Sequence, residues 1–114
     1  MLLGLGPDGH TVSLFPGTDA LDERHRWVTA PYVERQRGHR ITLTFPVLDR
    51  AREVVFLVAG REKAAALAKV LAPPPGEAPL PAARVRPAGV SPLWIVDREA
   101  ASLVPASPGT DRMP

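Results

Sequence analysis

The chain of 114 residues carries 14 basic and 12 acidic side chains, which leaves a formal net charge of only +2. So small a charge does not predict nucleic-acid binding, and no run approaches the roughly 20 apolar residues of a membrane helix. The chain has no cysteine, which excludes disulfides, zinc–thiolate clusters and thiol nucleophiles. We therefore expect a cytoplasmic protein without nucleic-acid or membrane partners, and nothing in the composition sets its oligomeric state.

Residues 1–17 join a short apolar run to a loop rich in glycine and proline. The run over 1–5 predicts a buried strand. The glycines, prolines and aspartate of 6–17 predict a loop with special backbone angles. Because open α/β sheets place their chemistry beyond the carboxyl ends of strands, Asp8 and His10 are candidate functional residues.

The segment 18–52 predicts one half-buried strand among short irregular elements. The alternation of polar and apolar residues over 40–45 is typical of a strand with one buried face. Pro46 can open a short helix that runs to Arg52. Three segments precede that strand: a helical turn over 18–24, β-forming residues over 27–33 that Pro31 breaks, and a charged loop over 34–39.

The segment 54–72 predicts a strand followed by a helix. The continuous apolar run over 54–59 is typical of a central parallel strand that is covered on both faces. The helix over 61–72 has one apolar stripe and ends before a Pro-Pro-Pro-Gly stop. The stripe consists of Ala64, Leu67, Ala68 and Leu71.

The last predicted elements are a strand over 93–96 and a short helix over 98–103 that Asp97 caps. A tail over 104–114, rich in proline, serine and glycine, is expected to be disordered. The order of strands and helices predicts an α/β fold with a mostly parallel sheet flanked by helices. Because the core begins with the first residues, we interpret 1–103 as the C-terminal portion of a larger domain.

The stretch Gly4-Leu5-Gly6-Pro7-Asp8-Gly9 matches the dinucleotide-binding pattern G-x-G-x-x-G. That pattern holds a pyrophosphate only when it opens a helix. Here Pro16-Gly17 ends any helix within two turns, so the context does not favour a nicotinamide or flavin cofactor.

Asp8 and His10 admit two interpretations. A histidine beside a carboxylate can act as a general base near neutral pH. Alternatively, Asp8 is a turn residue that bonds its own backbone, and His10 only follows it at the edge of the loop. A metal site is not expected, because His25 and His39 lie in polar segments and no histidine pair has the spacing of ligands on a helix.

Two basic residues stand at the ends of predicted elements. Arg40 begins the strand over 40–45, and Lys63 lies in the first turn of the helix over 61–72. Cations normally avoid the positive N-terminus of a helix, so a lysine there fits a bound anion. The alternative is a solvated surface lysine.

The loop 6–17 resembles the signature G-x-D-G-H-x-A-S-L-F-P-G of the 6-phosphogluconolactonase family, with Val12 in place of the small alanine. Related deaminases share the Asp-Gly-His core but continue differently, so Ser13-Leu14-Phe15-Pro16 favours the lactonase branch. The family's N-terminal half, with its Gly-Gly-x-Thr-Pro phosphate loop, finds no match in this sequence. Three further stretches resemble the family in the same order: 40–48, 55–64, and 81–85 with 93–101.

The resemblance implies a Rossmann-like α/β sandwich. It also implies hydrolysis of a sugar-phosphate lactone, 6-phospho-D-glucono-1,5-lactone, to 6-phospho-D-gluconate in the oxidative pentose phosphate pathway, with no metal or other cofactor. His10 would be the general base that activates water, and Asp8 would position or polarise it. The substrate-binding residues would be Arg40 and Lys63 for the phosphate, and Gly6 and Gly9 for the developing oxyanion through their loop amides.

Two other functions stay open. One is an amino-sugar-phosphate deaminase or isomerase of the same superfamily. A deaminase would release ammonia from its substrate. The other is a truncated, inactive remnant or a sugar-phosphate binding module, which would show no turnover. Measurement of the reaction products and of bound ligands distinguishes these two functions from lactone hydrolysis.

Overall fold

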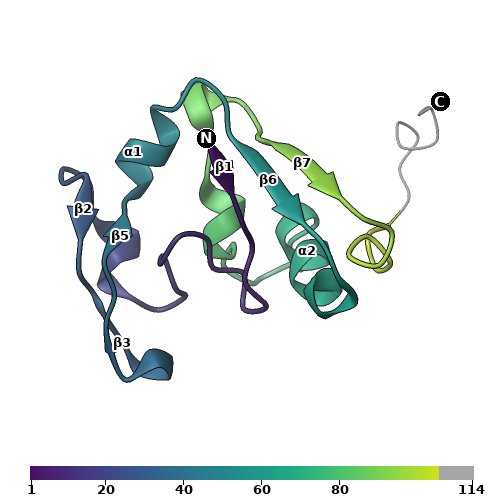
Figure 1. The fold of residues 1–114 in the computed structure, drawn as a ribbon, viewed down its shortest axis with the longest axis horizontal. Helices are drawn as coiled ribbons and strands as arrows, with labels where there is room; N and C mark the ends of the chain where they lie inside the picture. The colour runs from purple at the N-terminus through teal and green to yellow at the C-terminus, as the bar shows by residue number, and fades with distance from the viewer. Residues whose placement is uncertain (106–114) are drawn as a thin grey trace.

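The computed structural model describes residues 1–105, and its centre is a parallel sheet in the order β1-β6-β7 (Figure 1). The predicted central strand is confirmed as β6, and the α/β fold class is confirmed with it. Among the described residues, no helix is long and apolar enough to cross a membrane. The tail expected over 104–114 lies almost wholly outside those residues. The three strands are β1 (Leu2–Leu3), β6 (Val55–Val58) and β7 (Leu93–Val96).

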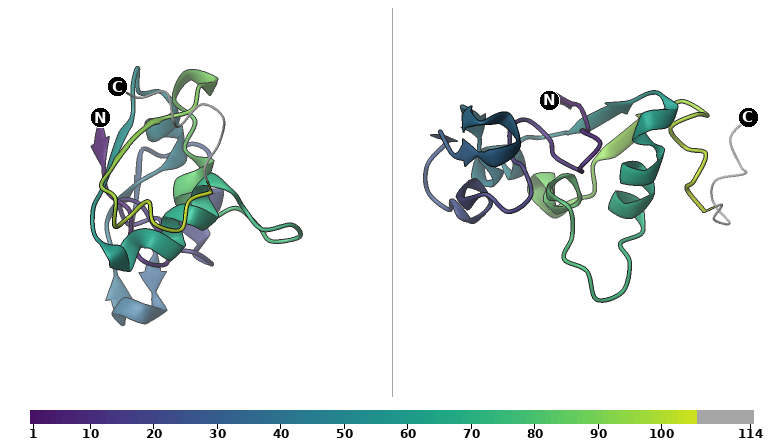
Figure 2. Two further views of the ribbon diagram at one scale, coloured as in Figure 1. Left: turned by 90° about the vertical axis from the view of Figure 1, so that its right-hand side faces the viewer. Right: turned by 90° about the horizontal axis from the view of Figure 1, so that it is seen from below.

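One face of the sheet packs against the helix α2 (Ala64–Leu71), which the right-hand view of Figure 2 shows beneath the strands. In the register of the sheet, Phe56 lies between Leu3 of β1 and Trp94 of β7. The Phe56 ring stacks on the Trp94 indole with 4.0 Å between the ring centroids. Phe56 and Leu67 of α2 are fully buried in the same core cluster, so this face is the main core of the molecule.

The opposite face of the sheet is exposed in this part of the chain. Side chains alternate along a strand, so Leu2, Leu57, Leu93 and Ile95 share that face, with exposed fractions of 68%, 49%, 60% and 52%. The prediction that the central strand is covered on both faces is therefore wrong for residues 1–105. An apolar run shows that a strand is hydrophobic, but burial of its two faces depends on which elements pack against each of them. In residues 1–105, α2 packs against one face.

We expect Phe56→Ala to lower the free energy of unfolding by about 3–5 kcal/mol, because it empties a fully buried site. Leu57 is the next residue on the same strand and points to the exposed face, so Leu57→Ala should cost less than about 1 kcal/mol. Urea unfolding of both variants and of the parent chain measures the two values. Equal losses would mean that the face carrying Leu57 is buried in solution.

The segment between β1 and β6 forms a small lobe beside the sheet (Figure 1). The β-forming stretch 27–33 is split by Pro31, as predicted, and its two parts join different ribbons. The prediction of a charged loop over 34–39 is wrong in part. This segment contains a 3₁₀ turn and a strand that pairs with Tyr32–Val33. The two antiparallel pairs are β2 (Val28–Thr29) with β5 (Thr42–Leu43), and β3 (Tyr32–Val33) with β4 (Gly38–His39).

The remaining elements are short. The helix predicted from Pro46 is confirmed as α1 (Phe45–Asp49), although it ends before Arg52. Asp97 accepts a hydrogen bond from the amide of Ala100 at 2.8 Å, as a cap does, but turns follow it in place of the predicted helix. The 3₁₀ turns span Asp19–Asp22, Glu34–Gln36, Arg61–Lys63, Pro81–Arg84 and Pro87–Gly89.

Candidate active site

A tight loop follows β1 and carries Asp8 and His10. The amide of Gly6 donates to the carbonyl of His10 at 2.8 Å, and the amide of Gly9 donates to the carbonyl of Gly6 at 2.9 Å. Gly9 has a φ of +85°, in the left-handed region that favours glycine. A Cβ at Gly9 would also lie 2.7 Å from Leu80. The loop therefore closes on itself and returns His10 to the carboxyl end of the strand.

The carboxylate of Asp8 bonds both the ring and the backbone of His10. Its Oδ1 lies 2.5 Å from Nδ1 and 3.1 Å from the backbone nitrogen of His10. Burial alone would raise the pKa of the Asp8 carboxyl, but the hydrogen bonds from the His10 ring and backbone outweigh burial and lower that pKa. An ionised Asp8 accepts a hydrogen bond from Nδ1–H, and in that tautomer His10 presents Nε2 as a proton acceptor. Asp8 is thus both a turn residue and the partner of the ring.

The His10 ring also has close carbon neighbours. Phe15 stacks on it with 4.1 Å between the ring centroids. Gly6 lies so close that a Cβ at this position would be 2.1 Å from ring atoms Nδ1 and Cε1. These contacts restrict the imidazole to the orientation in which it meets Asp8.

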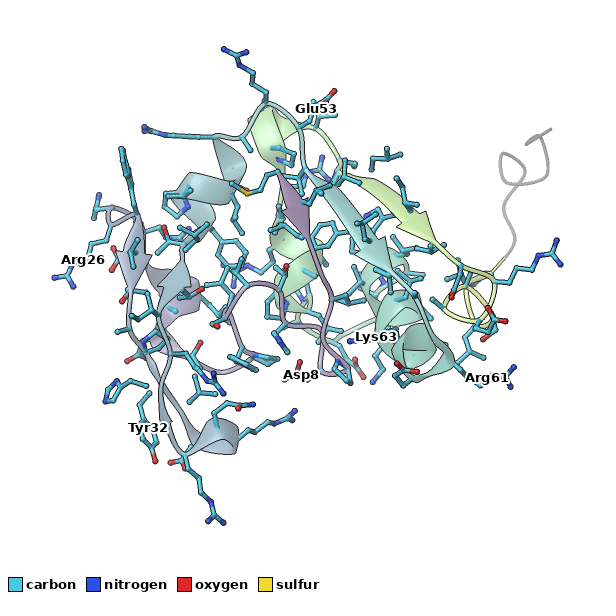
Figure 3. All side chains as sticks on the ribbon, viewed as in Figure 1. Asp8, Arg26, Tyr32, Glu53, Arg61 and Lys63 are labelled. Atoms are coloured by element: carbon cyan, nitrogen blue, oxygen red, sulfur yellow. The ribbon has the colours of Figure 1, made fainter. Side chains whose placement is uncertain are left out.

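Lys63 reaches the same loop from the start of α2, at the end of the sheet where Figure 3 labels both Asp8 and Lys63. Its Nζ donates to the carbonyl of Leu5 at 2.6 Å. Lys63 and His10 line one cavity of about 380 Å³ at the carboxyl end of β1. The structure therefore brings Lys63 to the cavity of His10 and has it brace the loop, while its predicted role in phosphate binding stays a prediction.

We expect Lys63→Met to lower the free energy of unfolding by about 1–2 kcal/mol, because the carbonyl of the buried Leu5 loses its charged donor. Lys69→Met is the matched control, since it removes an ammonium from α2 for which the structure of residues 1–105 gives no hydrogen bond or ion pair. Urea unfolding compares the two variants. Equal effects would show that the Leu5 contact contributes nothing.

Arg40 lies in the lobe, and the structure does not join it to the cavity. Its guanidinium donates to Oε1 of Gln36, and its amide donates to the carbonyl of Pro31. Within the described chain, no hydrogen bond or ion pair links Arg40 to His10 or Lys63. Its predicted role in phosphate binding therefore stays a prediction.

Arg35 is a residue at this site that the sequence analysis missed. It lies on the 3₁₀ turn Glu34–Gln36, and its Nη1 donates to Oδ2 of Asp8 at 3.2 Å. The two residues are 27 positions apart in the sequence, so no local pattern predicts their contact. The signal available was a basic residue two positions after the β-forming stretch 27–33.

Val12, which stands where the family signature has alanine, has a φ of +46°. β-branched residues rarely adopt this left-handed conformation, and a residue held there stores strain of about 1–3 kcal/mol. Strain therefore lies two residues beyond His10, on the wall of the cavity.

Potential metal ligands do not cluster in the described part of the chain, where no group of three or more histidine and acidic side chains gathers. The groups at the loop and cavity are instead an imidazole, a carboxylate and an ammonium. Such a set can move a proton to or from a neutral substrate and bind an anion.

Comparison with known proteins gives a consistent result. The family model described as glucosamine-6-phosphate isomerases/6-phosphogluconolactonase matches residues 1–94. The 6-phosphogluconolactonases of Rattus norvegicus and Homo sapiens are 43% and 44% identical to this chain over 106 residues, which cover 91% of this chain and 40% of each relative. The chain therefore spans about 40% of the length of these curated relatives.

Solved structures agree with the sequence comparison. The 6-phosphogluconolactonase of Trypanosoma brucei has a TM-score of 0.74 at 33% identity, over 89% of this chain and 40% of that one. A monomeric glucosamine-6-phosphate deaminase of the NagB superfamily has a TM-score of 0.68 at 25% identity, over 90% of this chain and 46% of that one. The resemblance carried by residues 6–17 is confirmed, and the chain belongs to the glucosamine-6-phosphate isomerase/6-phosphogluconolactonase family.

Proposed function

We propose that this chain hydrolyses 6-phospho-D-glucono-1,5-lactone to 6-phospho-D-gluconate in the cytoplasmic oxidative pentose phosphate pathway. The observation that carries the proposal is the Asp8–His10 pair, whose Oδ1 and Nδ1 atoms lie 2.5 Å apart, with His10 at the cavity that Lys63 also lines. Family membership supports the substrate, because the curated relatives are named 6-phosphogluconolactonases.

His10 acts as the general base of the proposed reaction. Asp8 accepts a hydrogen bond from Nδ1–H, which leaves Nε2 unprotonated, so that it takes a proton from water while the water oxygen attacks the lactone carbonyl. The tetrahedral intermediate expels the ring oxygen, which takes the proton back from Nε2. The ester C–O bond breaks, one water is consumed, and the product carries a carboxyl and a hydroxyl group. A base placed in this way contributes about 10²–10⁴-fold to the rate.

Lys63 binds the anionic part of the substrate in this proposal, since its ammonium lies at the cavity. Binding a remote phosphate orients the lactone toward the base and lowers the entropic cost of reaction. The amides of Gly6 and Gly9 already donate within the loop, so they are not free to stabilise the oxyanion, although Gly6 lines the cavity. Arg40 stays a predicted phosphate contact that rests on the likeness of residues 40–48 to the family.

A product assay tests the proposal. The chain covers 40% of the rat relative, so two proteins are compared: the chain alone, and a hybrid in which the chain replaces the matching part of the rat protein (the rat hybrid). A coupled assay measures 6-phospho-D-gluconate with spontaneous hydrolysis subtracted. We expect hydrolysis above background by the rat hybrid. A rat hybrid that folds and binds the lactone without hydrolysing it would favour a binding module.

The deaminase reaction is the second candidate, because a monomeric glucosamine-6-phosphate deaminase shares the fold at a TM-score of 0.68. Its identity of 25% is lower than the 43% and 44% of the curated rat and human lactonases, which favours lactone hydrolysis. Incubation of the same proteins with glucosamine 6-phosphate, followed by measurement of ammonia, separates the two reactions. Ammonia release without lactone hydrolysis would replace the first proposal.

A further inference from the structure

The carboxylate of Asp8 has two oxygens with different partners. Oδ1 accepts hydrogen bonds from the ring and the backbone amide of His10, whereas Oδ2 accepts one from Nη1 of Arg35 at 3.2 Å. We propose that Arg35 is a positioning residue, which holds the Asp8 carboxylate in the rotation that presents Oδ1 to His10. The proposal rests on the hydrolytic function proposed above, because its effect on rate passes through His10.

Rotation of the carboxylate is the freedom that Arg35 removes. The torsion that turns a carboxylate is broad and roughly two-fold, so one pair of contacts at Oδ1 does not define it. A second donor at Oδ2 fixes the plane of the group, and a guanidinium does this better than an ammonium because its donors are rigid and planar. The contact is also charge-assisted, and the ionised carboxylate that it holds is the form that accepts the hydrogen bond from Nδ1–H.

The lobe places Arg35 at this oxygen through the β3–β4 ribbon. Val33, the last residue of β3, is only 2% exposed and anchors the ribbon in the molecule. The 3₁₀ turn after it carries Arg35 and ends at Arg37, whose amide donates to the carbonyl of Glu34. Arg40 joins the ribbon to the turn through its hydrogen bond with Gln36.

Exposure separates a positioning role from a role in folding. The side chain of Arg35 is 71% exposed and that of Asp8 is 11% exposed. An ion pair with one partner so exposed adds little to stability. Loss of Arg35 should therefore reduce the turnover number and leave the unfolding midpoint unchanged.

The kinetic test compares Arg35→Ala, Arg35→Lys and Arg37→Ala in the full chain and in the rat hybrid. Arg37 is the matched control, because it lies two residues further along, at the C-terminal cap of the same turn, and no hydrogen bond or ion pair within residues 1–105 involves its side chain. We expect Arg35→Ala to lower kcat about tenfold, with KM and the urea midpoint unchanged, and Arg35→Lys to restore part of the loss. Arg37→Ala should match the parent. A rise in KM at constant kcat would overturn the proposal, because Arg35 would then contact the substrate.

A second readout needs no turnover. Nitrogen-15 chemical shifts of the His10 ring report whether Nδ1 or Nε2 carries the proton. The parent chain and Arg37→Ala should show the Nδ1–H form. In Arg35→Ala the fraction of the Nε2–H form should increase, because Oδ1 of Asp8 is no longer held opposite Nδ1. If this shift occurs in a protein that does not hydrolyse the lactone, the positioning role stands and the proposed function fails. An active protein in which Arg35→Ala changes neither kcat nor the ring overturns the positioning role alone.

Discussion

Replacing His10 with alanine should reduce kcat/KM for lactone hydrolysis by about 10²–10⁴-fold. The variant loses the Nε2 atom that the proposed mechanism uses to take the proton from water, while Lys63 and the cavity that it lines are retained. Because the proposed reaction assigns His10 to the transition state and Lys63 to binding, the loss should fall on kcat more than on KM. The measurement is 6-phospho-D-gluconate released by the rat hybrid, with the spontaneous rate subtracted.

His25→Ala is the matched control for this prediction. His25 is exposed, and it contacts Glu23 through its backbone amide rather than its ring, so the variant should hydrolyse the lactone at the parent rate. Hydrolysis by His10→Ala at the parent rate, in a rat hybrid that is otherwise active, would show that another group activates the water.

The parallel sheet and its helix were predictable because their signals are local. The apolar runs that became β6 and β7 contain few residues that a buried strand excludes. The helix α2 stops before three prolines, a local signal that packing elsewhere does not override. The predicted apolar stripe is wrong in part, because Leu71 is 42% exposed and the buried face consists of Ala64, Ala66, Leu67 and Val70. The loop after β1 was predictable as well, since its glycines and prolines leave the backbone few other conformations.

The elements that were missed depend on partners distant in the sequence. Gly38 and His39 form β4 only because Val33 and Tyr32 lie opposite them, and neither glycine nor histidine has a strong β preference. The open face of the sheet is a similar case. Leu57 has the hydrophobicity of a buried residue and is nevertheless 49% exposed, because burial needs a covering element that no single strand can specify.

The candidate site divides in the same way. Asp8 and His10 are two residues apart, so their contact follows from a turn that the sequence predicts. Arg35 meets the other oxygen of Asp8 across 27 residues, and that contact follows from the lobe as a whole. The roles expected of Gly6 and Gly9 depended on free amides, and only the folded loop reveals that both amides already donate to its own carbonyls.

Gly6→Ala should lower lactone hydrolysis nearly as much as the loss of His10 itself, by about 100-fold or more. The added Cβ would lie 2.1 Å from Nδ1 and Cε1 of His10, a separation that atoms do not tolerate. The ring must swing away, and the 2.5 Å contact between Nδ1 and Asp8 Oδ1 is lost with it. Stability should fall by about 1–3 kcal/mol, as it does when a packed site receives an extra methyl group.

Gly4→Ala provides the control, since a Cβ at Gly4 has nothing within 4 Å and neither Gly4 nor Gly6 has a positive φ. It should therefore keep the parent rate to within about twofold. Its stability should stay within about 1 kcal/mol of the parent, which is the size of the effect that replacing glycine has on the entropy of the unfolded chain. Rates from the coupled assay and the nitrogen-15 shifts of the His10 ring should change together in Gly6→Ala and remain unchanged in Gly4→Ala. A normal rate in Gly6→Ala would mean that the base acts from a ring orientation other than the one that Asp8 holds.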